Sequence, residues 1–579
     1  MDKGGNKVLR DVNCGELRVK DEGEVFTLAG WVRKIRDHGE IIFIDLWDRY
    51  GVTQVVFSPE DLKLRERAKK LGLEWVIRVK GKVKKRPKEM VNPELGTGEI
   101  ELVVSEFDIL NKSEVPPFVV KEDLKAEWEL RLKYRYLDIR RDMVMRGFVL
   151  RHQLMQKARE FLNNKGFLEV ETPVLARSTP EGARDFLVPS RMHPGNFYSL
   201  AQSPQLYKQI LMIAGFDRYY QFARCFRDED MRGDRQLEHT QIDIEMAYPD
   251  CEDIYELGEG LMVYIVEGAL GEKPVTPFPR IPYKESMEKY GTDKPDIRNP
   301  LIIEDYTQIA KSGEFDIFNK SDVTRGIKIK KLLTRKEIDN FERVVQDVGA
   351  KGLLYLINEG GKLRAPFAKY FKDLDGFGVV RGETLLLISG KTSEVLEPLG
   401  VLRNELGEKF ELLTDGWRFL WVTDFPIFKW NEEENIWTPS HHIFTQSVGD
   451  LDKVEDDPGK VIGKLYDLVL NGVELGSGSI RNHDPGVQKR LLRVIGMTDE
   501  EAEERFGFLL RALSYGAPPH GGIALGFDRI CRLLAGLESI TEVMTFPKTL
   551  TGVGLMEESP STVSEEDLKE LKLEIKKDE

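Results

Sequence analysis

The stretch FRDEDMRGDRQLEHTQIDIE, residues 226–245, decides how this chain is interpreted. Half of its residues are charged, and it ends in a run in which polar and apolar residues alternate. Such alternation places successive side chains on opposite faces of a strand. The predicted strand therefore has one apolar and one polar face: Ile242, Ile244 and Met246 on the first, and Gln241, Asp243 and Glu245 on the second.

The segment before it, QFARCFRDED (221–230), alternates as well, and MRGDRQLE (231–238) can join the two strands as an antiparallel hairpin. Arg227 lies at the end of the first strand. A guanidinium beside carboxylates in a cleft suits a substrate that carries both phosphate and ammonium groups. The alternative is a structural network of salt bridges, and the hairpin alone does not separate the two.

A glycine-rich segment near the C-terminus, GAPPHGGIALGFDRICRLLAG (516–536), predicts a strand that runs into a helix. Gly521, Gly522 and Gly526 permit close backbone approach. Arg529 falls in the first turn of the predicted helix, where a helix N-terminus and a guanidinium could jointly hold a polyphosphate. Helix–sheet packing also selects glycines, so this segment by itself does not define a nucleotide site.

Length and composition indicate a globular chain of several domains, since single cores stop growing well below 579 residues. No apolar run approaches the roughly eighteen residues that a membrane span needs, and the N-terminus lacks the apolar core of a signal sequence. We therefore expect no membrane association. The cysteines lie far apart and show no metal-ligand spacing, which predicts a cytoplasmic protein without zinc: Cys14, Cys225, Cys251 and Cys531.

The net charge of -14 does not exclude nucleic acid, because binding follows local patches of charge. Residues 61–90 contain twelve Lys or Arg against four Asp or Glu. Within them, IRVKGKVKK (77–85) puts its basic residues on one strand face: Arg78, Lys80, Lys82 and Lys84. That face is either a solvated strand surface or a surface that follows phosphates, and composition leaves both interpretations open.

Composition also divides the chain into segments. Residues 1–108 contain roughly five β-rich segments and one helix-like segment, which predicts a small closed barrel such as the OB-fold. A polar linker, 109–135, precedes mixed helices and strands over 136–285 and 416–557. Residues 286–415 between them lack the arginine-rich motifs and are expected to form an inserted domain. The charged C-terminal extension, 558–579, is expected to be helical or frayed.

Three stretches together resemble motifs 1, 2 and 3 of the class II aminoacyl-tRNA synthetases, in the correct order: FLEVETPVL (167–175), the opening stretch (226–245) and GIALGFDRICRLL (522–534). Other segments are similar to the bacterial-type aspartyl-tRNA synthetases: TPEGARDFLVPSR (179–191), SPQLYKQILM (203–212), YGTDKPDIRNP (290–300) and ELGSGSIRNHDP (474–485). The resemblance covers nearly the whole chain. It implies an α+β multidomain fold with an N-terminal OB-fold β-barrel, a catalytic domain on an antiparallel sheet, and an α+β insertion domain.

The resemblance also implies roles for matching residues. Arg227 and Arg529 would be catalytic, at the α- and γ-phosphates of ATP, and Arg481 with Lys208 would grip the substrate's side-chain carboxylate. The implied aspartate site consists of Glu181, Ser203, Gln205, Lys208, Arg227, Gln241, Asp243, His441 and Arg481. The implied ATP site consists of Arg227, Asp228, Glu229, Gln236, His239, Glu474, Gly526, Phe527, Asp528 and Arg529. The carboxylates of Asp467 and Glu474 would hold Mg²⁺, a hard cation that prefers oxygen ligands.

In the barrel, the resemblance implies an anticodon site at Arg36, Asp37, His38, Phe43 and Gln54. Phe43 would stack on an anticodon base and Gln54 would read the central one, as single-stranded RNA is usually read. From its local sequence IIFIDL alone, Phe43 is interpreted as a core residue.

Two histidines depart from the common family pattern. His239 stands where many relatives have a Phe that stacks on adenine, and an imidazole can stack as well. His38 replaces a Leu of relatives that are strict for tRNA-Asp, and some relaxed relatives carry His there. The resemblance therefore implies tRNA-Asn as a second substrate.

The implied activity is that of an aspartate–tRNA ligase, which joins L-aspartate to the 3′ terminal adenosine of tRNA with Mg²⁺ and ATP. The implied partners are tRNA-Asp, tRNA-Asn, a second copy in a homodimer and a tRNA amidotransferase. Pro173 of motif 1 carries the homodimer inference, although it could simply end a strand. One rival is an enzyme for asparagine or lysine, disfavoured by Arg481 and Lys208. Another is an RNA-binding paralogue without chemistry, disfavoured by the intact motif residues.

Overall fold

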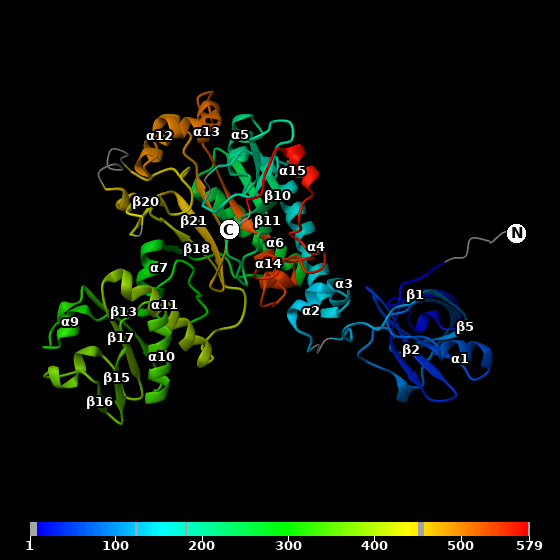
Figure 1. Cartoon of the computed structure of the whole chain (residues 1–579). Helices are drawn as coiled ribbons and strands as arrows, with labels where there is room; N and C mark the ends of the chain where they lie inside the picture. Colours follow the sequence, from blue (N-terminus) through cyan, green and yellow to red (C-terminus); the bar gives the residue numbers. More distant parts are fainter. Residues whose placement is uncertain (1–8, 122–124, 180–181, 433, 450–456, 577–579) are drawn as a thin grey trace. The chain divides into compact units, whose positions relative to one another are not determined.

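Figure 1 shows the chain in the computed structural model, which describes residues 9–121, 125–179, 182–432, 434–449 and 457–576. The chain divides into two compact units. One consists of residues 1–149 with 541–561, and the other of residues 150–540 with 562–579. Each unit has hydrophobic cores of its own.

The first unit contains a closed five-stranded barrel in the order β1-β2-β3-β5-β4. Its strands are β1 (Val25–Asp37), β2 (Ile42–Asp48), β3 (Gly51–Phe57), β4 (Val76–Lys85) and β5 (Ile100–Asn111). α1 (Leu62–Ala68) connects β3 to β4, and two short 3-10 turns, η1 (Val19–Asp21) and η2 (Lys88–Met90), flank β1 and β4. Five strands and one helix in the expected order confirm the predicted OB-fold.

The alternation along β2 decides which of its side chains fill the barrel. Ile42 and Ile44 belong to the barrel core, whereas Phe43 between them is only half-buried. Because neighbouring side chains on a strand point to opposite faces, the interpretation of Phe43 as a core residue is wrong. Its ring meets the ring of His38 edge-on, with the centroids 5.8 Å apart.

β4 has the predicted alternation, but its basic face is not uniform. Arg78 is buried, with Nη1 3.1 Å from both Glu106 and Asp108. Lys80, Lys82 and Lys84 are exposed. The arginine therefore has a structural partner, and only the three lysines are left to meet solvent or phosphate.

The expected linker, 109–135, is not a plain connector. β5 runs into it, and it contains α2 (Trp128–Lys133), which α3 (Arg135–Asp138) follows directly. The buried Arg135 donates hydrogen bonds to the carbonyl oxygens of Thr541 and Met544. Residues 541–561 thus pack in the first unit, whereas the sequence analysis grouped them with 416–557.

The second unit is built on an eight-stranded sheet in the order β12-β18-β21-β22-β23-β11-β10-β6. Its strands are β6 (Leu168–Glu169), β10 (Arg218–Phe226), β11 (Glu238–Ala247), β12 (Arg280–Pro282), β18 (Phe419–Thr423), β21 (Leu465–Leu470), β22 (Val473–Ile480) and β23 (His520–Gly526). Neighbours from β18 to β10 are antiparallel, and only the edge strands β12 and β6 pair in parallel. This confirms the predicted antiparallel sheet.

Helices pack against this sheet and lie beside it in Figure 1. They include α4 (Asp142–Asn164), α5 (Gln205–Ile213), α6 (Cys251–Leu270) and α14 (Phe527–Leu534). α5 and α14 contact β11, and α6 contacts β23. The sequence MVMRGFVLRHQLMQKAREFLNNKG (143–166) is amphipathic and closes on a glycine, which predicts a helix, and the structure has α4 there. Gly166 has the positive φ of 80° that ends many helices.

β10 and β11 form the predicted hairpin and pair from Arg218↔Met246 to Phe226↔Glu238. On its other side β11 pairs with β23. A Cβ atom on Gly522 would lie 2.0 Å from the carbonyl oxygen of Ile244 and 2.3 Å from Glu245 Oε2. Only glycine fits there, so Gly522 lets β23 approach the polar face of β11 closely.

The sequence FLEVETPVL (167–175) predicts a strand that ends at Pro173, and the strand in the structure is shorter than that. Only β6 pairs with β10, while β7 (Leu175–Ala176) joins a separate small sheet with β8 (Leu187–Pro189) and β9 (Phe197–Leu200). Pro173 lies between β6 and β7. Because proline has no amide hydrogen, a ladder rarely continues through it.

The inserted region has a five-stranded antiparallel sheet of its own, in the order β13-β14-β17-β15-β16. Its strands are β13 (Ile303–Asp305), β14 (Val323–Ile329), β15 (Leu354–Glu359), β16 (Lys362–Arg364) and β17 (Thr384–Gly390). Its helices and turns are α8 (Thr307–Ala310), α9 (Asp316–Lys320), α10 (Arg335–Asp347), η3 (Ala368–Tyr370), η4 (Asp375–Phe377) and α11 (Thr392–Lys409). β12 and β18, on either side of this region, are neighbours in the large sheet. The chain therefore leaves and re-enters that sheet at one place, while the limits 286 and 415 stay a prediction.

The remaining elements are α7 (Tyr283–Tyr290), β19 (Phe428–Asn431), β20 (Ile436–Pro439), η6 (Pro458–Lys460), α12 (Pro485–Val494), α13 (Asp499–Leu513), η7 (Ile540–Glu542) and α15 (Glu565–Leu571). In the part of the chain that the structure describes, no helix combines the length and apolar character that crossing a membrane requires.

Candidate active site

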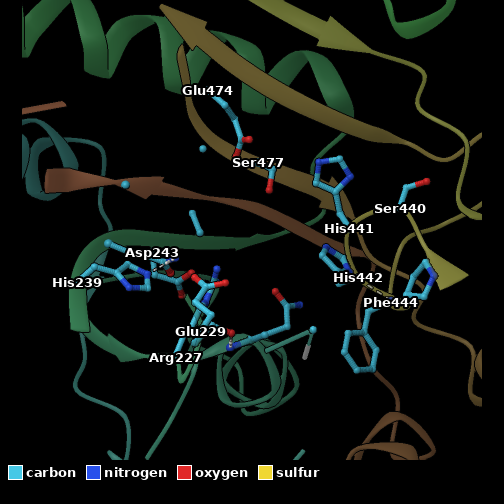
Figure 2. A pocket seen from close by; sticks show the side chains of 18 of the residues that line it. Arg227, Glu229, His239, Asp243, Ser440, His441, His442, Phe444, Glu474 and Ser477 are labelled. Atoms are coloured by element: carbon cyan, nitrogen blue, oxygen red, sulfur yellow. Dashed lines mark hydrogen bonds between the residues drawn. The ribbon is translucent and has the colours of Figure 1, made fainter. Parts of the chain in front are cut away.

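A cavity of about 930 Å³ in the second unit lies beside β11, β22 and β23, the loop 438–444 and the start of α14. The predicted site residues on its wall are Ser203, Gln205, Lys208, Arg227, Glu229, Gln236, His239, Gln241, Asp243, His441, Glu474, Arg481, Gly526, Asp528 and Arg529. Figure 2 shows the side chains of the hairpin gathered on one side of the pocket, namely Arg227, Glu229, His239 and Asp243. The hairpin and the glycine-rich strand thus supply one shared site.

Four buried charges lie at the floor of this cavity: Lys208, Asp243 and Arg481 line it, and Glu245 lies behind them. Lys208 Nζ lies 2.7 Å from Asp243 Oδ1 and 3.3 Å from Glu245 Oε2. Arg481 meets Glu245 through two hydrogen bonds, from Nε to Oε1 at 2.9 Å and from Nη2 to Oε2 at 3.0 Å. None of the four side chains is more than 1% exposed. Two cations and two carboxylates balance, as buried charges must.

The protonation of the two carboxyl groups follows from these contacts. Burial raises the pKa of Asp243, and Lys208 opposes that effect. Burial alone would also raise the pKa of Glu245, but Arg481 and Lys208 hold it below its ordinary value. Glu245 is therefore ionised and keeps Arg481 in one orientation.

The orientation of Arg481 leaves one edge of its guanidinium for a ligand. Glu245 occupies the edge formed by Nε and Nη2, and Nη1 donates to Ser479 Oγ at 3.0 Å and faces His442 Nε2. Guanidinium has five N–H groups, and Glu245, Ser479 and His442 meet four of them, so a further carboxylate meets the one that remains, on Nη2, at the end formed by Nη1 and Nη2. Burial, with Arg481 nearby, lowers the pKa of His442, and its neutral ring does not compete for that carboxylate.

Other polar atoms of the cavity have no partner within the described residues. They are Asp243 Oδ2, Gln205 Nε2, Ser440 Oγ and His441 Nδ1. A buried polar atom without a partner is costly, and several around one cavity indicate a polar ligand. An acceptor on Asp243 and a donor on Gln205 in one cavity suit a molecule with both an ammonium and a carboxylate group.

Two arginines are candidates for phosphate contacts. The structure gives the Arg227 side chain no hydrogen bond or ion pair among the residues it describes, and this side chain lines the cavity. Arg529 Nη1 donates to the carbonyl oxygen of Glu474 at 3.0 Å, and Nη2 lies 3.3 Å from Asp234 Oδ2. Both cations therefore face the same space from different elements.

His239 lies on the same wall, close to both arginines. Burial, with Arg227 and Arg529 nearby, lowers the pKa of His239 to about 3. The imidazole is therefore neutral at physiological pH. A neutral aromatic ring in a polar cavity can stack on a flat base.

The predicted magnesium ligands differ in their access to the cavity. Glu474 lines it, about one-third exposed, and its carboxylate oxygens suit a hard cation. The side chain of Asp467 is buried behind His441, whose Nε2 lies 3.2 Å from Asp467 Oδ2. Glu474 thus fits the predicted role, whereas Asp467 would have to leave His441. No group of three metal-binding side chains occurs among the residues that were described.

Three further predicted residues lie off the cavity wall or outside the structure. Phe527 is fully buried and packs edge-on against Phe222, so only its backbone could reach a nucleotide. Asp228 lies in an isolated bridge with Arg184. Glu181 falls outside the described residues. The roles of these residues stay predictions.

Some residues of the site were missed by the sequence analysis. Glu245 was recognised only as part of a polar strand face, yet it holds Arg481. His442 and Asp234, which contact the two key arginines, gave no usable signal. The alternation of the strand could have indicated Glu245, since it shares a face with Asp243.

The predicted anticodon residues lie together on the barrel. Arg36 forms a bidentate ion pair with Asp45, at 2.6 and 3.1 Å, and its Nη2 also donates to Gln54 Oε1 at 3.0 Å. Gln54 in turn donates to Glu101. This polar chain lies beside a face on which Phe43 and His38 are accessible, as a base-stacking surface requires.

Comparison with known proteins agrees with this geometry. Residues 127–550 match the family model described as tRNA synthetases class II (D, K and N), and residues 26–110 match the OB-fold nucleic acid binding domain. The chain therefore belongs to the class II tRNA synthetases of this group.

Individual relatives show which synthetases of this group the chain is similar to. A protein named Aspartate--tRNA(Asp/Asn) ligase from Desulfatibacillum aliphaticivorans is 46% identical over 586 residues, which cover 98% of each chain. A protein with the same name from Caldanaerobacter subterraneus is 46% identical over 97% of this chain and 98% of its own. Among solved structures, asparaginyl-tRNA synthetase from Pyrococcus horikoshii, complexed with asparaginyl-adenylate, has a TM-score of 0.60 at 21% identity. It covers 94% of this chain and 99% of its own, and at this identity it supports the fold alone.

Proposed function

We propose that this protein is an aspartate–tRNA ligase that charges tRNA-Asp and also tRNA-Asn. The observation that carries the proposal is the buried floor of the cavity. There Arg481, held by Glu245, and Lys208, held by Asp243, lie below a mouth lined with Arg227 and Arg529. A dicarboxylate with an ammonium group fits this floor, and a polyphosphate fits the mouth.

The first step joins two anions. A carboxylate oxygen of aspartate attacks the α-phosphorus of ATP, the bond to the bridging oxygen breaks, and pyrophosphate leaves. Arg227 would offset the repulsion at the α-phosphate and Arg529 at the γ-phosphate. The carboxylate is already a nucleophile, so catalysis rests on positioning and electrostatic stabilisation rather than on a protein base.

Mg²⁺ would enter with ATP, held by Glu474, and would supply further positive charge beside the phosphates. The remaining positions follow from the cavity wall. His239 would stack on adenine, Glu229 and Gln236 would line the nucleotide site, and Ser203, Gln205 and Gln241 would surround the amino acid. His441 would close over the substrate from its loop.

Selectivity against asparagine follows from the charge of the floor. The positive charges of Arg481, at the end formed by Nη1 and Nη2, and of the nearby Lys208 favour a ligand that carries a carboxylate. A neutral amide would turn its own N–H donors toward these buried cationic donors, and donors that face each other in a dry site weaken binding. The second step then moves the aspartyl group to the terminal adenosine of tRNA, with AMP as the leaving group.

The barrel would read the anticodon through Phe43, Gln54, Arg36 and Asp37. His38 beside Phe43 is the feature that would admit tRNA-Asn as well as tRNA-Asp. Aspartyl-tRNA-Asn needs a later amidation, so a tRNA amidotransferase would be a partner. We propose that the protein acts on these substrates in the cytoplasm.

The proposal includes a homodimer formed through motif 1. Large apolar side chains are exposed around β6 to β9, namely Leu168, Val174, Leu175, Leu187 and Phe197. A contiguous exposed apolar area is typical of an interface, and Pro173 lies among these residues. Light scattering on the purified protein would test it, with a dimer mass expected.

Pyrophosphate exchange tests the chemistry directly. We expect exchange between labelled pyrophosphate and ATP that requires aspartate and Mg²⁺ and is not supported by asparagine or lysine. Exchange that depends on asparagine or lysine would contradict the assigned substrate, and no exchange with any of the three would contradict the enzymatic proposal.

A further inference from the structure

Arg151, a residue of α4 that does not line the cavity, holds the carboxylate next to Arg529. Its Nη1 lies 2.5 Å from Asp528 Oδ1. Asp528 is only 3% exposed, and Arg151 is its only ion-pair partner among the described residues. The two residues are separated by 377 positions in the sequence, so the contact joins distant elements.

The second carboxylate oxygen of Asp528, Oδ2, accepts a hydrogen bond at the point where the pairing of β11 with β23 ends. β11 pairs with β23 as far as Gln241↔Gly526. The next amide, that of Thr240, donates instead to Asp528 Oδ2 at 2.7 Å. The carboxylate of Asp528 thus ties the first turn of α14 to the end of β11.

Arg151 supports this junction at two more points. Its Nη2 lies 3.3 Å from Thr240 Oγ1, and its guanidinium lies 4.8 Å from the centroid of the Phe527 ring. Arg529 follows Asp528 directly, in the first turn of α14. One half-buried guanidinium therefore fixes the turn that carries Arg529.

We propose that Arg151 is a positioning residue that acts through Asp528 to aim Arg529 at the triphosphate. This inference rests on the proposed function, because it takes Arg529 as the group that meets the terminal phosphate of ATP. Without Arg151, the buried carboxyl group of Asp528 is left with one neutral donor, and the first turn of α14 shifts. A shift of about 1 Å is enough to weaken a directional contact to phosphate.

The test compares ATP with AMP, because AMP lacks the phosphates that Arg529 would contact. Binding of both nucleotides is measured by calorimetry for the unaltered protein and for R151Q, R151K and the matched control R159Q. Arg159 lies on the same helix and is paired with Glu169, but it is partly exposed and far from Asp528 in the hydrogen-bond network. We expect R151Q to raise the Kd for ATP about tenfold and the Kd for AMP less than twofold. The Kd for ATP of R151K, which keeps a cationic donor, should lie between those of the unaltered protein and R151Q. The Kd values of R159Q should match those of the unaltered protein.

A purely structural role predicts a different result. Equal weakening of ATP and AMP in R151Q, or unchanged binding of both, would overturn the inference. If R151Q does not fold, D528N serves instead, since its amide oxygen still accepts from Thr240 while the ion pair is lost. It should show the same selective loss for ATP, and an equal loss for AMP would overturn the inference.

The unaltered protein separates this inference from the proposed function. If it shows no aspartate-dependent pyrophosphate exchange and binds neither nucleotide, both fail. If it exchanges and binds ATP while R151Q behaves like R159Q, the function stands and only the positioning role fails.

Discussion

Arg481 and Glu245 face each other through two parallel hydrogen bonds, with both side chains buried. The pair fixes the guanidinium so that only one of its edges is open toward the cavity. Since a bidentate pair is directional, Arg481, the residue proposed to set amino-acid specificity, is oriented before any substrate binds. The proposed selectivity for aspartate depends on this pair.

Replacing Arg481 should therefore remove the response to aspartate. We expect R481Q to lower kcat/KM for aspartate in pyrophosphate exchange by about 100-fold or more, because truncation leaves Glu245 buried without its main partner. R493Q is the matched control, since Arg493 forms an exposed pair with Asp499, and such pairs contribute little. An R481Q enzyme that activates aspartate as well as R493Q does would contradict the assignment of Arg481 to the aspartate site.

The neutral state of His239 predicts how ATP binding responds to substitution. Stacking on a base contributes about 1–3 kcal/mol, so H239A should raise the KM for ATP by roughly five- to a hundredfold. H239F should restore stacking to within about twofold of the unaltered enzyme. Because the pKa of His239 is lowered to about 3, the KM ratio between H239F and the unaltered enzyme should stay constant from pH 6 to pH 8. A ratio that changes through pH 6.5 would show that the imidazole takes up a proton there.

The same histidine links stability to pH. The pKa of His239 is lower in the folded chain than in the unfolded chain, where it is close to 6.5. The unfolded state therefore binds a proton that the folded state does not, and this contribution to stability is lost as the pH falls from about 6.5 toward 3. H239F should lose less free energy of unfolding between pH 7.5 and pH 5 than the unaltered protein does, as measured by urea denaturation. Equal losses would contradict the low pKa.

Phe43 should matter for tRNA and not for adenylate formation. We expect F43A to raise the KM for tRNA by roughly five- to a hundredfold, the range of one lost stacking contact, with pyrophosphate exchange unchanged. F26A is a useful control, because Phe26 packs against the core of the same barrel. If F43A lowers stability as F26A does but leaves the KM for tRNA unaltered, Phe43 has a packing role only.

His38 should affect the choice between the two tRNAs. H38L is expected to lower the charging of tRNA-Asn relative to tRNA-Asp by about tenfold. The reason is that the His38 side chain is exposed and its ring lies edge-on to that of Phe43. The ratio of kcat/KM for the two transcripts measures this effect. An unchanged ratio would show that His38 does not determine whether the enzyme charges tRNA-Asn.

Local sequence patterns predicted the elements of the site, but not how their side chains pair. The alternation over 238–247 indicated the hairpin and the polar face, and Gly522 was recognised as a point of close approach. The partner of Arg481 could not be predicted, because Glu245 lies 236 positions away and no periodicity connects them. The buried state of Arg78 has the same origin, because it is decided by Glu106 and Asp108, which are its neighbours in space.

The most direct test of the account is aspartylation of purified tRNA-Asp and tRNA-Asn transcripts, side by side, with Mg²⁺ and ATP. We expect both transcripts to become charged with aspartate and neither to become charged with asparagine. Charging of tRNA-Asp alone would agree with the proposed aspartate–tRNA ligase activity and contradict the proposal that tRNA-Asn is a second substrate. If neither transcript accepts aspartate, the proposed function itself is contradicted.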